Sequence, residues 1–312
     1  MKGVIMNCYL APMEGITGYV YRRAQHACFP SFDKYFTPFI APKQNKALNA
    51  GERRDVLPEH NEGIYLVPQI LTGRAEDFIR AAKALQEFGY HEVNLNLGCP
   101  SATVVSKRKG AGMLEDPSRL SAFLEAIYDG LRMDISIKTR LGMEDAEEFG
   151  RLLEIFNRYP VKELIIHPRV REDYYGNRPD WKAFGDALRH SACPVVYNGD
   201  LFSTEDVEAL REAFPEVETI MLGRGAIANP ALIRELSGGA ALSAKELEAF
   251  LARLTGDYEE ILSGERDVLF RMKELWAYLE WRFPGKDRQI RRIRKAQRIC
   301  EYEEAVRCLL RC

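Results

Sequence analysis

The 312-residue sequence lacks any long apolar stretch, and none approaches the roughly 18 uninterrupted apolar residues typical of a membrane span. Its seven cysteines are odd in number and show no CxxC spacing, which argues against a disulfide framework or a zinc site, so no metal is expected. The first residues, MKGVIMNCYLAPMEG, lack the charged segment, apolar core and cleavage site of a secretory leader. We therefore expect a cytoplasmic protein with no membrane partner, and we expect a monomer.

The sequence also has little net charge, because 44 Lys and Arg residues are balanced by 46 Asp and Glu residues. This balance hides a gradient: residues 264–312 hold 13 basic and 8 acidic residues, and the rest of the chain holds 31 and 38. Between Arg282 and Arg298, eight basic residues accompany one acidic residue. Charge alone leaves two interpretations open, a solvated helix face or a surface for a polyanion.

Eight short apolar segments alternate with helical patterns in the first 237 residues. Their near-continuous apolar character is typical of strands buried on both faces. We predict strands at 4–10, 34–39, 64–70, 92–97, 134–139, 161–166, 194–198 and 218–222, and helices at 17–28, 74–88, 117–131, 145–158, 181–190, 203–214 and 229–236. Eight such units favour a (β/α)8 TIM barrel over a doubly wound sheet, whose dinucleotide fingerprint is also missing.

The pattern changes after Ser237-Gly-Gly-Ala240. A capping box at Ser243–Glu246 opens a region that reads as helices only. We therefore predict an α/β fold with a barrel domain at 1–237 and an all-helical domain at 238–312 that carries the basic segment.

Polar and glycine residues gather where the predicted strands end, which is where barrel enzymes build their active sites. Glycines and an arginine after the last two strands predict a phosphate cradle, because exposed backbone N–H groups and a guanidinium attract anions. A lysine at the end of the fifth strand would stabilise negative charge on a flavin ring, whose carbonyls Gln69 and Asn96 would contact. Cys99 lies between Gly98 and Pro100 in a loop, and we interpret it as a general acid or nucleophile.

The chain resembles the tRNA-dihydrouridine synthase family along nearly its whole length. The residues that carry the resemblance are APMEGIT (11–17), NLNLGCPSATVVSKRKGAGML (94–114), KTRLG (138–142), IHPR (166–169), DYYGNRPDW (173–181), NGD (198–200) and GRGAIANP (223–230). The resemblance implies a barrel with tightly bound FMN that reduces the carbon 5–carbon 6 double bond of particular uridines in tRNA, with NADPH as reductant. It implies that Cys99 protonates carbon 5 while reduced flavin delivers hydride to carbon 6.

The same resemblance implies roles for the other motif residues. The implied cofactor contacts are Pro12, Met13, Gln69, Asn96, Lys138, His167, Asn198, Gly199, Asp200, Gly223 and Arg224. For RNA we expect one patch near the chemistry and a second on the helical domain, because a large folded RNA is gripped at two places. The expected RNA-binding residues are Lys107, Arg108, Lys109, Arg169, Arg288, Arg291, Arg292, Arg294 and Lys295. Tyr174, Tyr175 and Trp181 would either stack on bases or pack at the barrel rim.

Gly18, Asn94 and Pro168-Arg169-Val170 depart from the family's usual residues, which leaves the substrate subclass open. Three alternatives also stay open: an FMN-dependent reductase of a small molecule, resembling dihydroorotate or enoate reductases; an RNA-binding protein without catalysis; and rRNA in place of tRNA. The basic carboxyl-terminal segment argues against the first, and Cys99, Lys138 and His167 argue against the second.

Overall fold

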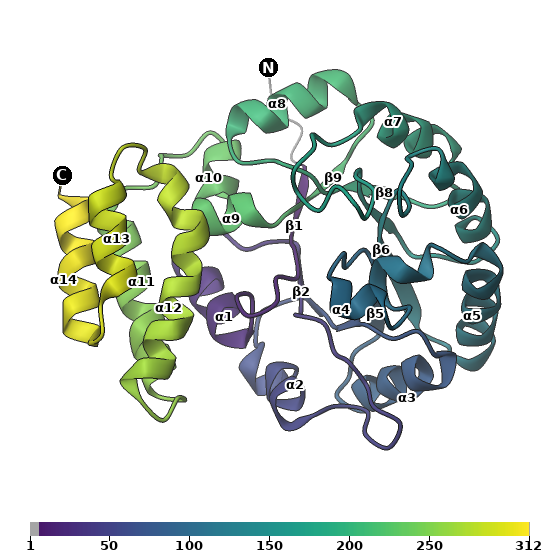
Figure 1. Cartoon of the computed structure of the whole chain (residues 1–312), viewed down its shortest axis with the longest axis horizontal. Coiled ribbons are helices and arrows are strands. Elements are labelled where there is room, and N and C mark those ends of the chain that lie inside the picture. The colour runs from purple at the N-terminus through teal and green to yellow at the C-terminus, as the bar shows by residue number, and fades with distance from the viewer. Residues whose placement is uncertain (1–5, 312) are drawn as a thin grey trace.

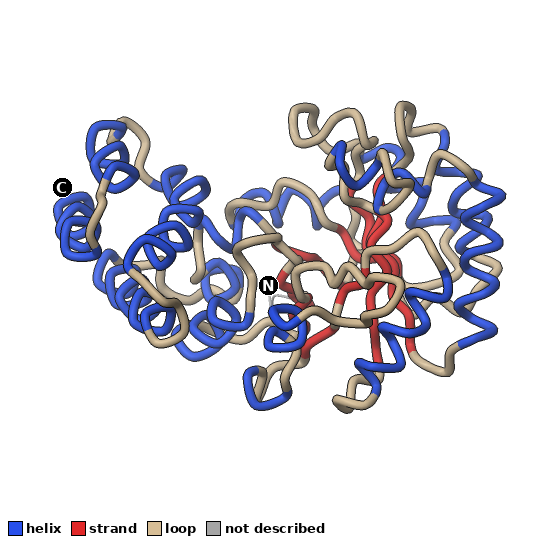
Figure 2. The backbone as a smooth tube through the Cα atoms, turned by 60° about the horizontal axis from the view of Figure 1, so that its bottom comes forward, coloured by secondary structure: helices blue, strands red, loops and turns tan. Residues whose placement is uncertain are grey.

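A parallel barrel with helices around it forms one side of the molecule, and the carboxyl-terminal helices (yellow in Figure 1) lie together beside it (Figure 1; Figure 2). The computed structural model describes residues 6–311. Their strands are β1 (Asn7–Leu10), β2 (Lys34–Phe36), β3 (Leu66–Val67), β4 (Gln69–Ile70), β5 (Glu92–Leu97), β6 (Asp134–Arg140), β7 (Leu164–His167), β8 (Val195–Tyr197) and β9 (Thr219–Leu222). The strand order is β3-β2-β1-β9-β8-β7-β6-β5-β4, and every pairing between these strands is parallel. The predicted barrel is therefore confirmed.

The third predicted strand differs in one respect, because Pro68 divides it into β3 and β4. Proline has no backbone N–H to donate to a ladder. The first half pairs with β2, and the second half pairs with β5. The Pro68 carbonyl still accepts from the Asn94 N–H at 2.9 Å. The interrupted strand thus joins the two ends of the sheet and closes the barrel.

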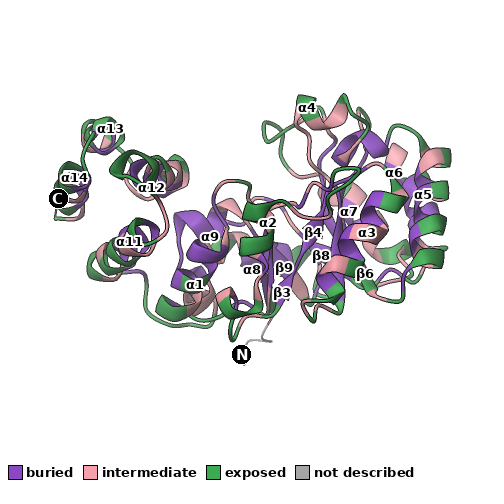
Figure 3. Cartoon of the chain, turned by 90° about the horizontal axis from the view of Figure 1, so that it is seen from below, coloured by how far each residue is buried: buried purple, intermediate pink, exposed green. Residues whose placement is uncertain are grey.

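Helices alternate with the strands, and most of them cover the outside of the barrel, while the short helix α4 (Ala102–Val105) lies over one end of it (Figure 1; Figure 3). They are α1 (Tyr19–Cys28), α2 (Ala50–Asp55), α3 (Ala75–Gln86), α4 (Ala102–Val105), α5 (Pro117–Gly130), α6 (Glu148–Phe156), α7 (Trp181–His190), α8 (Thr204–Ala213), α9 (Arg224–Ala228) and α10 (Leu232–Leu236), with 3-10 turns η1 (Pro58–His60) and η2 (Gly110–Met113). Ser203 accepts from the Asp206 N–H and caps the start of α8, which lies within the helix predicted at 203–214. The helix predicted at 229–236 is wrong at its start: α9 begins at Arg224, directly after β9, and α10 is separate.

The barrel interior is packed with side chains. Inward-facing residues form one inner apolar cluster, which consists of Tyr9, Ala11, Phe36, Val67, Ile165, Val196 and Met221. Near the amino-terminal ends of the strands, Lys34 Nζ lies 3.0 Å from carboxylate oxygens of both Glu92 and Glu163. In this fold, residues at the amino-terminal ends of the strands contribute to stability, and active sites lie at the carboxyl ends. The active site is therefore expected at the end opposite these ion pairs.

Residues after α10 form helices packed on one another: α11 (Ala244–Glu259), α12 (Glu265–Leu279), the turn η3 (Glu280–Arg282), α13 (Asp287–Lys295) and α14 (Ile299–Leu310). Ser243 caps α11 through the predicted capping box. Phe250 of α11 packs edge-on against Tyr21 and Phe29 at ring distances of 5.8 and 5.2 Å. α12 contacts α9 beside the barrel (Figure 1). No helix within residues 6–311 is long and apolar enough to cross a bilayer.

Candidate active site

A cavity of about 80 Å³ opens at the carboxyl ends of the strands. Nine of the eleven residues predicted to contact a cofactor line it, namely Pro12, Met13, Lys138, His167, Asn198, Gly199, Asp200, Gly223 and Arg224. They come from loops far apart in sequence, and the parallel barrel brings those loops to one face. Gln69 and Asn96 lie beside the cavity, in a buried hydrogen-bond chain.

This chain runs between β4, β5 and β6 and ends at the cysteine loop. Asn94 Nδ2 donates to Ser136 Oγ at 3.0 Å, Gln69 Nε2 donates to Asn94 Oδ1 at 2.8 Å, and Asn96 Nδ2 donates to Gln69 Oε1 at 2.7 Å. Asn96 Oδ1 then accepts from the backbone N–H groups of Gly98 and Cys99, at 3.1 and 3.0 Å. Asn96 therefore fixes the start of the loop that carries the thiol.

The Cys99 thiol is half-buried, and this burial raises its pKa. A backbone hydrogen bond from Ser101 and the positive charges of Arg140 and Lys138 oppose that shift without cancelling it. A free cysteine titrates near 8.5, so a raised pKa keeps the thiol protonated at neutral pH. Cys99 is thus suited to donate a proton.

Lys138 and His167 lie in a strongly positive environment. Burial, together with the nearby Arg140 charge, lowers the pKa of Lys138 to about 7. Burial and four surrounding cations lower the pKa of His167 well below its usual value, which keeps the imidazole neutral. No carboxylate within residues 6–311 forms an ion pair with Lys138. The excess of cations favours an anionic ligand.

The burial of Arg169 contradicts the prediction that it binds RNA, because only 2% of the residue is exposed. Its guanidinium contacts His167 Nε2 at 2.9 Å and forms an ion pair with Asp200. Asp200 also forms an ion pair with Arg224. Arg169 therefore positions His167 and Asp200, which line the cavity, and it is not accessible to phosphates at the surface.

Short-range contacts shape the remaining cavity loops. In the β1–α1 loop, the Met13 N–H donates to Thr17 Oγ1 at 2.8 Å, while the Ile16 and Thr17 N–H groups donate to the Met13 carbonyl at 3.0 Å. Asn198 Nδ2 donates to the Met221 carbonyl at 2.8 Å and so joins the ends of β8 and β9. A Cβ atom at Gly225 would overlap the Leu201 carbonyl oxygen, so glycine is required there for packing.

Arg140 is an important site residue that the sequence reasoning passed over. Its Nε donates to the Gly98 carbonyl at 3.0 Å, its Nη1 to the Val170 carbonyl at 2.8 Å, and its Nη2 to the Tyr174 carbonyl at 2.6 Å. It therefore ties the cysteine loop to the loop after β7. The signal was available, because Arg140 follows Lys138 by two residues and shares its face of the strand.

The aromatic residues after β7 have different environments. Trp181 is half-buried, donates to Tyr197 Oη at 2.9 Å, and packs against Phe214, so it is a packing residue. Tyr175 is 54% exposed and covers the cavity, with its ring 4.5 Å from the Arg224 guanidinium carbon and 5.8 Å from the His167 ring.

The two predicted basic patches lie at the surface. Lys107 and Arg108 are exposed and Lys109 is half-buried, just after α4. In α13, the cations Arg288, Arg291, Arg292, Arg294 and Lys295 are all exposed, while Ile290 and Ile293 anchor the helix. Arg292 and Arg294 form ion pairs with Glu304 and Glu280. Figure 3 shows α4 and α13 on the same side of the molecule, α4 over the barrel and α13 among the helices that follow the barrel in the chain.

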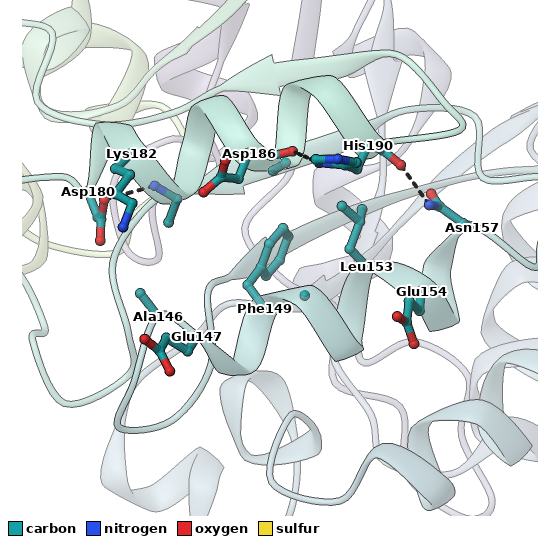
Figure 4. Close-up of a pocket in the computed structure, with 13 residues that line it drawn as sticks. Ala146, Glu147, Phe149, Leu153, Glu154, Asn157, Asp180, Lys182, Asp186 and His190 are labelled. Carbon is teal, nitrogen blue, oxygen red and sulfur yellow. Dashed lines mark hydrogen bonds between the residues drawn. The ribbon is translucent and has the colours of Figure 1, made fainter.

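A second cavity of about 700 Å³ lies outside the barrel, between α6 and α7 (Figure 4). Its rim carries Glu147, Glu154, Asp180 and Asp186 against Lys182 and His190. This cavity contains none of the predicted site residues, and its acidic rim disfavours an anion. The cavity at the barrel mouth therefore remains the candidate active site.

The fold and the candidate site define an α/β-barrel enzyme that has a half-buried thiol near a cavity lined by Lys138 and Arg224 at the barrel mouth. The sequence model described as "Dihydrouridine synthase (Dus)" matches residues 9–274. The chain belongs to the dihydrouridine synthase family.

Curated relatives agree with this family. The chain is 29% identical to tRNA-dihydrouridine synthase B of Pseudomonas putida, over 70% of this chain and 67% of that protein. It is 28% identical to a probable tRNA-dihydrouridine synthase of Rhodobacter capsulatus, over 87% and 85%, and 28% identical to tRNA-dihydrouridine(16) synthase of Escherichia coli K12, over 73% and 75%.

Solved structures share the barrel fold at low identity. Morphinone reductase in complex with tetrahydroNAD matches with a TM-score of 0.54 and 12% identity, over 76% of this chain and 88% of that one. Histamine dehydrogenase from Rhizobium sp. 4-9 matches with a TM-score of 0.57 and 12% identity, over 82% and 49%.

Proposed function

We propose that this protein reduces specific uridines in tRNA to 5,6-dihydrouridine, with FMN as its tightly bound cofactor and NADPH as reductant. The observation that carries the proposal is the position of the Cys99 thiol near Lys138, at a cavity lined by Lys138 and Arg224, in a chain of the dihydrouridine synthase family. Curated relatives are named for dihydrouridine synthesis in tRNA, which supports tRNA over rRNA. Because tRNA is the proposed substrate, the cytoplasm is the proposed compartment, and we propose a monomer.

The chemistry of the cavity fits a flavin mononucleotide. Arg224 and the backbone of Gly199 and Gly223 would hold the phosphate, Lys138 and His167 would contact the ring and ribityl chain, and Pro12 and Met13 would pack against the ring. When bound, FMN supplies the hydride. Tyr175 lines the same cavity, and its ring lies 4.5 Å from the Arg224 guanidinium carbon, so it would border the bound cofactor.

The protein's own contribution is proton delivery and charge placement. Hydride addition at carbon 6 leaves negative charge at carbon 5, and the protonated Cys99 Sγ supplies the proton there. Asn96 accepts a hydrogen bond from the Cys99 N–H, and Arg140 donates one to the Gly98 carbonyl, so both residues hold the loop that carries the thiol. Asp200 holds Arg224 at the cavity through an ion pair. The basic patch after α4 and the cations of α13 would bind backbone phosphates, because they lie on one side of the molecule.

Cys99→Ala in the FMN-loaded enzyme tests the acid role. We expect flavin absorbance and NADPH oxidation to remain, and dihydrouridine in an unmodified tRNA transcript, measured by mass spectrometry, to fall by roughly 10²–10⁴-fold. Cys193→Ala is the matched control, because Cys193 is also half-buried but lies near Ser191, away from the cavity. An unchanged rate for Cys99→Ala would remove the thiol from proton transfer. Equal activity on ribosomal RNA would broaden the substrate class.

A further inference from the structure

Exposed aromatic side chains cluster near the barrel mouth and on the facing side of α12. Within residues 6–311, the large exposed hydrophobic residues are Tyr65, Tyr174, Tyr175, Phe270 and Trp281. All but Tyr65 have an arginine guanidinium carbon within 6 Å of the ring: Tyr174 with Arg171 at 5.3 Å, Tyr175 with Arg224 at 4.5 Å, Phe270 with Arg271 at 5.9 Å and Trp281 with Arg224 at 5.9 Å. We call Tyr174, Tyr175, Phe270 and Trp281 the aromatic ridge.

Trp281 brings the helical domain to the cofactor cavity. Its ring packs edge-on against Phe202, a cavity residue, at 5.0 Å, yet 46% of the residue remains exposed. Tyr175 covers the same Arg224 from the barrel side. The guanidinium carbon of Arg224 therefore lies within 6 Å of two exposed rings, Tyr175 of the barrel and Trp281 of η3.

Phe270 extends the ridge along α12. Phe270, Glu274, Tyr278 and Trp281 follow one another at intervals of three or four residues, which places them on one side of α12 and η3. The carboxylate of Glu274 would lie 3.2 Å from a Cβ atom at Gly15, and Arg271 Nη1 donates to the Gly15 carbonyl at 3.0 Å. This side of α12 therefore faces the β1–α1 loop at the barrel mouth.

The chemistry of the ridge fits unpaired nucleotides. Bases that leave the helical stack gain free energy by stacking on aromatic rings and guanidinium planes, and arginines also bind the phosphates between them. Phe270 is 60% exposed, and burying such a ring against a base removes apolar surface from water. Arg288, Arg291 and Lys295 of α13 are exposed and form no ion pair within residues 6–311, and they provide complementary charge on the same group of helices.

We propose that the aromatic ridge is a stacking surface for unpaired nucleotides that flank the target uridine in the RNA substrate. The proposal rests on the proposed function, since it takes the substrate to be tRNA. A uridine must leave its stack to reach Cys99, and the ridge provides the displaced neighbours with alternative stacking partners. The ridge therefore supplies affinity that does not depend on phosphate charge.

Salt dependence separates stacking from phosphate binding. We expect Phe270→Ala and Trp281→Ala to weaken binding of an unmodified tRNA transcript by roughly 5- to 150-fold each. The slope of log affinity against log salt should stay unchanged in both variants. Arg291→Ala should reduce that slope by about one, because it removes one phosphate contact. Phe270→Leu and Trp281→Phe are the matched controls. Trp281→Phe keeps an aromatic ring and should keep most of the affinity for tRNA, whereas Phe270→Leu keeps apolar volume without a ring and should lose affinity.

Tryptophan fluorescence gives a readout that is independent of activity. Trp276 is buried and donates to Tyr302, and Trp181 donates to Tyr197, so Trp281 is the most exposed of the three tryptophans. Titration with tRNA should quench the emission of the wild type and leave that of Trp281→Phe nearly constant.

Three outcomes would overturn the proposal. The first is wild-type tRNA affinity in both Phe270→Ala and Trp281→Ala. The second is a loss that changes the salt slope. The third is a protein dimer, seen by sedimentation, that these substitutions dissociate. If ring-dependent tRNA binding is found without any dihydrouridine formation, the proposed function fails while the ridge stands.

Discussion

Asn96→Ala tests whether a single buried amide fixes the catalytic loop. The wild-type side chain makes three hydrogen bonds, two to the Gly98 and Cys99 N–H groups and one to Gln69. Each such bond contributes about 1 kcal/mol net, so the substitution should reduce the free energy of unfolding by about 3 kcal/mol. About 2 kcal/mol of this loss concerns the cysteine loop alone, which corresponds to a roughly 30-fold higher population of locally opened loop.

Asn94→Ala is a closely matched control. Asn94 lies in the same strand, is fully buried and also bonds Gln69, but its second bond goes to Ser136 and not to the loop. Its loss should reduce the free energy of unfolding by about 2 kcal/mol and leave the loop closed. Urea unfolding measures the stability of both variants.

Alkylation of Cys99 under native conditions, followed peptide by peptide by mass spectrometry, measures the loop directly. We expect roughly 30-fold faster labelling in Asn96→Ala and a wild-type rate in Asn94→Ala. Cys28 and Cys300 are exposed in all variants and serve as internal references. Equal labelling of Cys99 in the two variants would refute the idea that Asn96 closes the loop.

Three further predictions concern the pKa of Lys138 and the packing around two glycines. The folded pKa of Lys138, about 7, lies below its usual value of 10.5, so the unfolded chain binds more protons between these pH values and stability should rise with pH across that window. Lys138→Met should flatten this rise, and urea unfolding from pH 7 to 10 measures the difference; parallel curves would contradict the shift. Gly225→Ala, at the start of α9, should lower the free energy of unfolding by several kcal/mol, because the added Cβ would overlap the Leu201 carbonyl oxygen. Gly256 lies in α11, and a Cβ atom added there would have no neighbour from outside its own helical turn within 4 Å. Gly256→Ala should therefore raise the free energy of unfolding by about 0.5–1 kcal/mol, measured by thermal unfolding. A lower stability of this variant would show that the added methyl group meets other atoms.

Much of the cavity was predictable because the barrel itself determines it. Once eight parallel strands are identified, the residues that follow them must meet at one face, so Met13, Lys138, His167 and Arg224 could be grouped without coordinates. Helix starts were predictable for a local reason, since Ser203 and Ser243 cap their own helices through residues three positions away. The division of the chain at residue 237 stays a prediction.

Other features depend on partners that lie far apart in the sequence. An arginine in a loop is usually exposed, which is why Arg169 was expected at the surface. In the folded protein its guanidinium is buried and contacts His167 and Asp200. The hydrogen bond from Asn96 to Gln69 joins residues 27 positions apart, and no spacing rule foretells it.

The sequence by itself determined the barrel, the helical region after it, the thiol and the basic segment, because periodicity, capping and charge are local properties of the chain. Only the tertiary structure decided which cations are exposed and which are buried, how Asn96 and Arg140 hold Cys99, and that the Trp281 ring, which follows α12, lies 5.9 Å from the Arg224 guanidinium carbon. These are long-range contacts, and their geometry exists only once the strands and helices have packed.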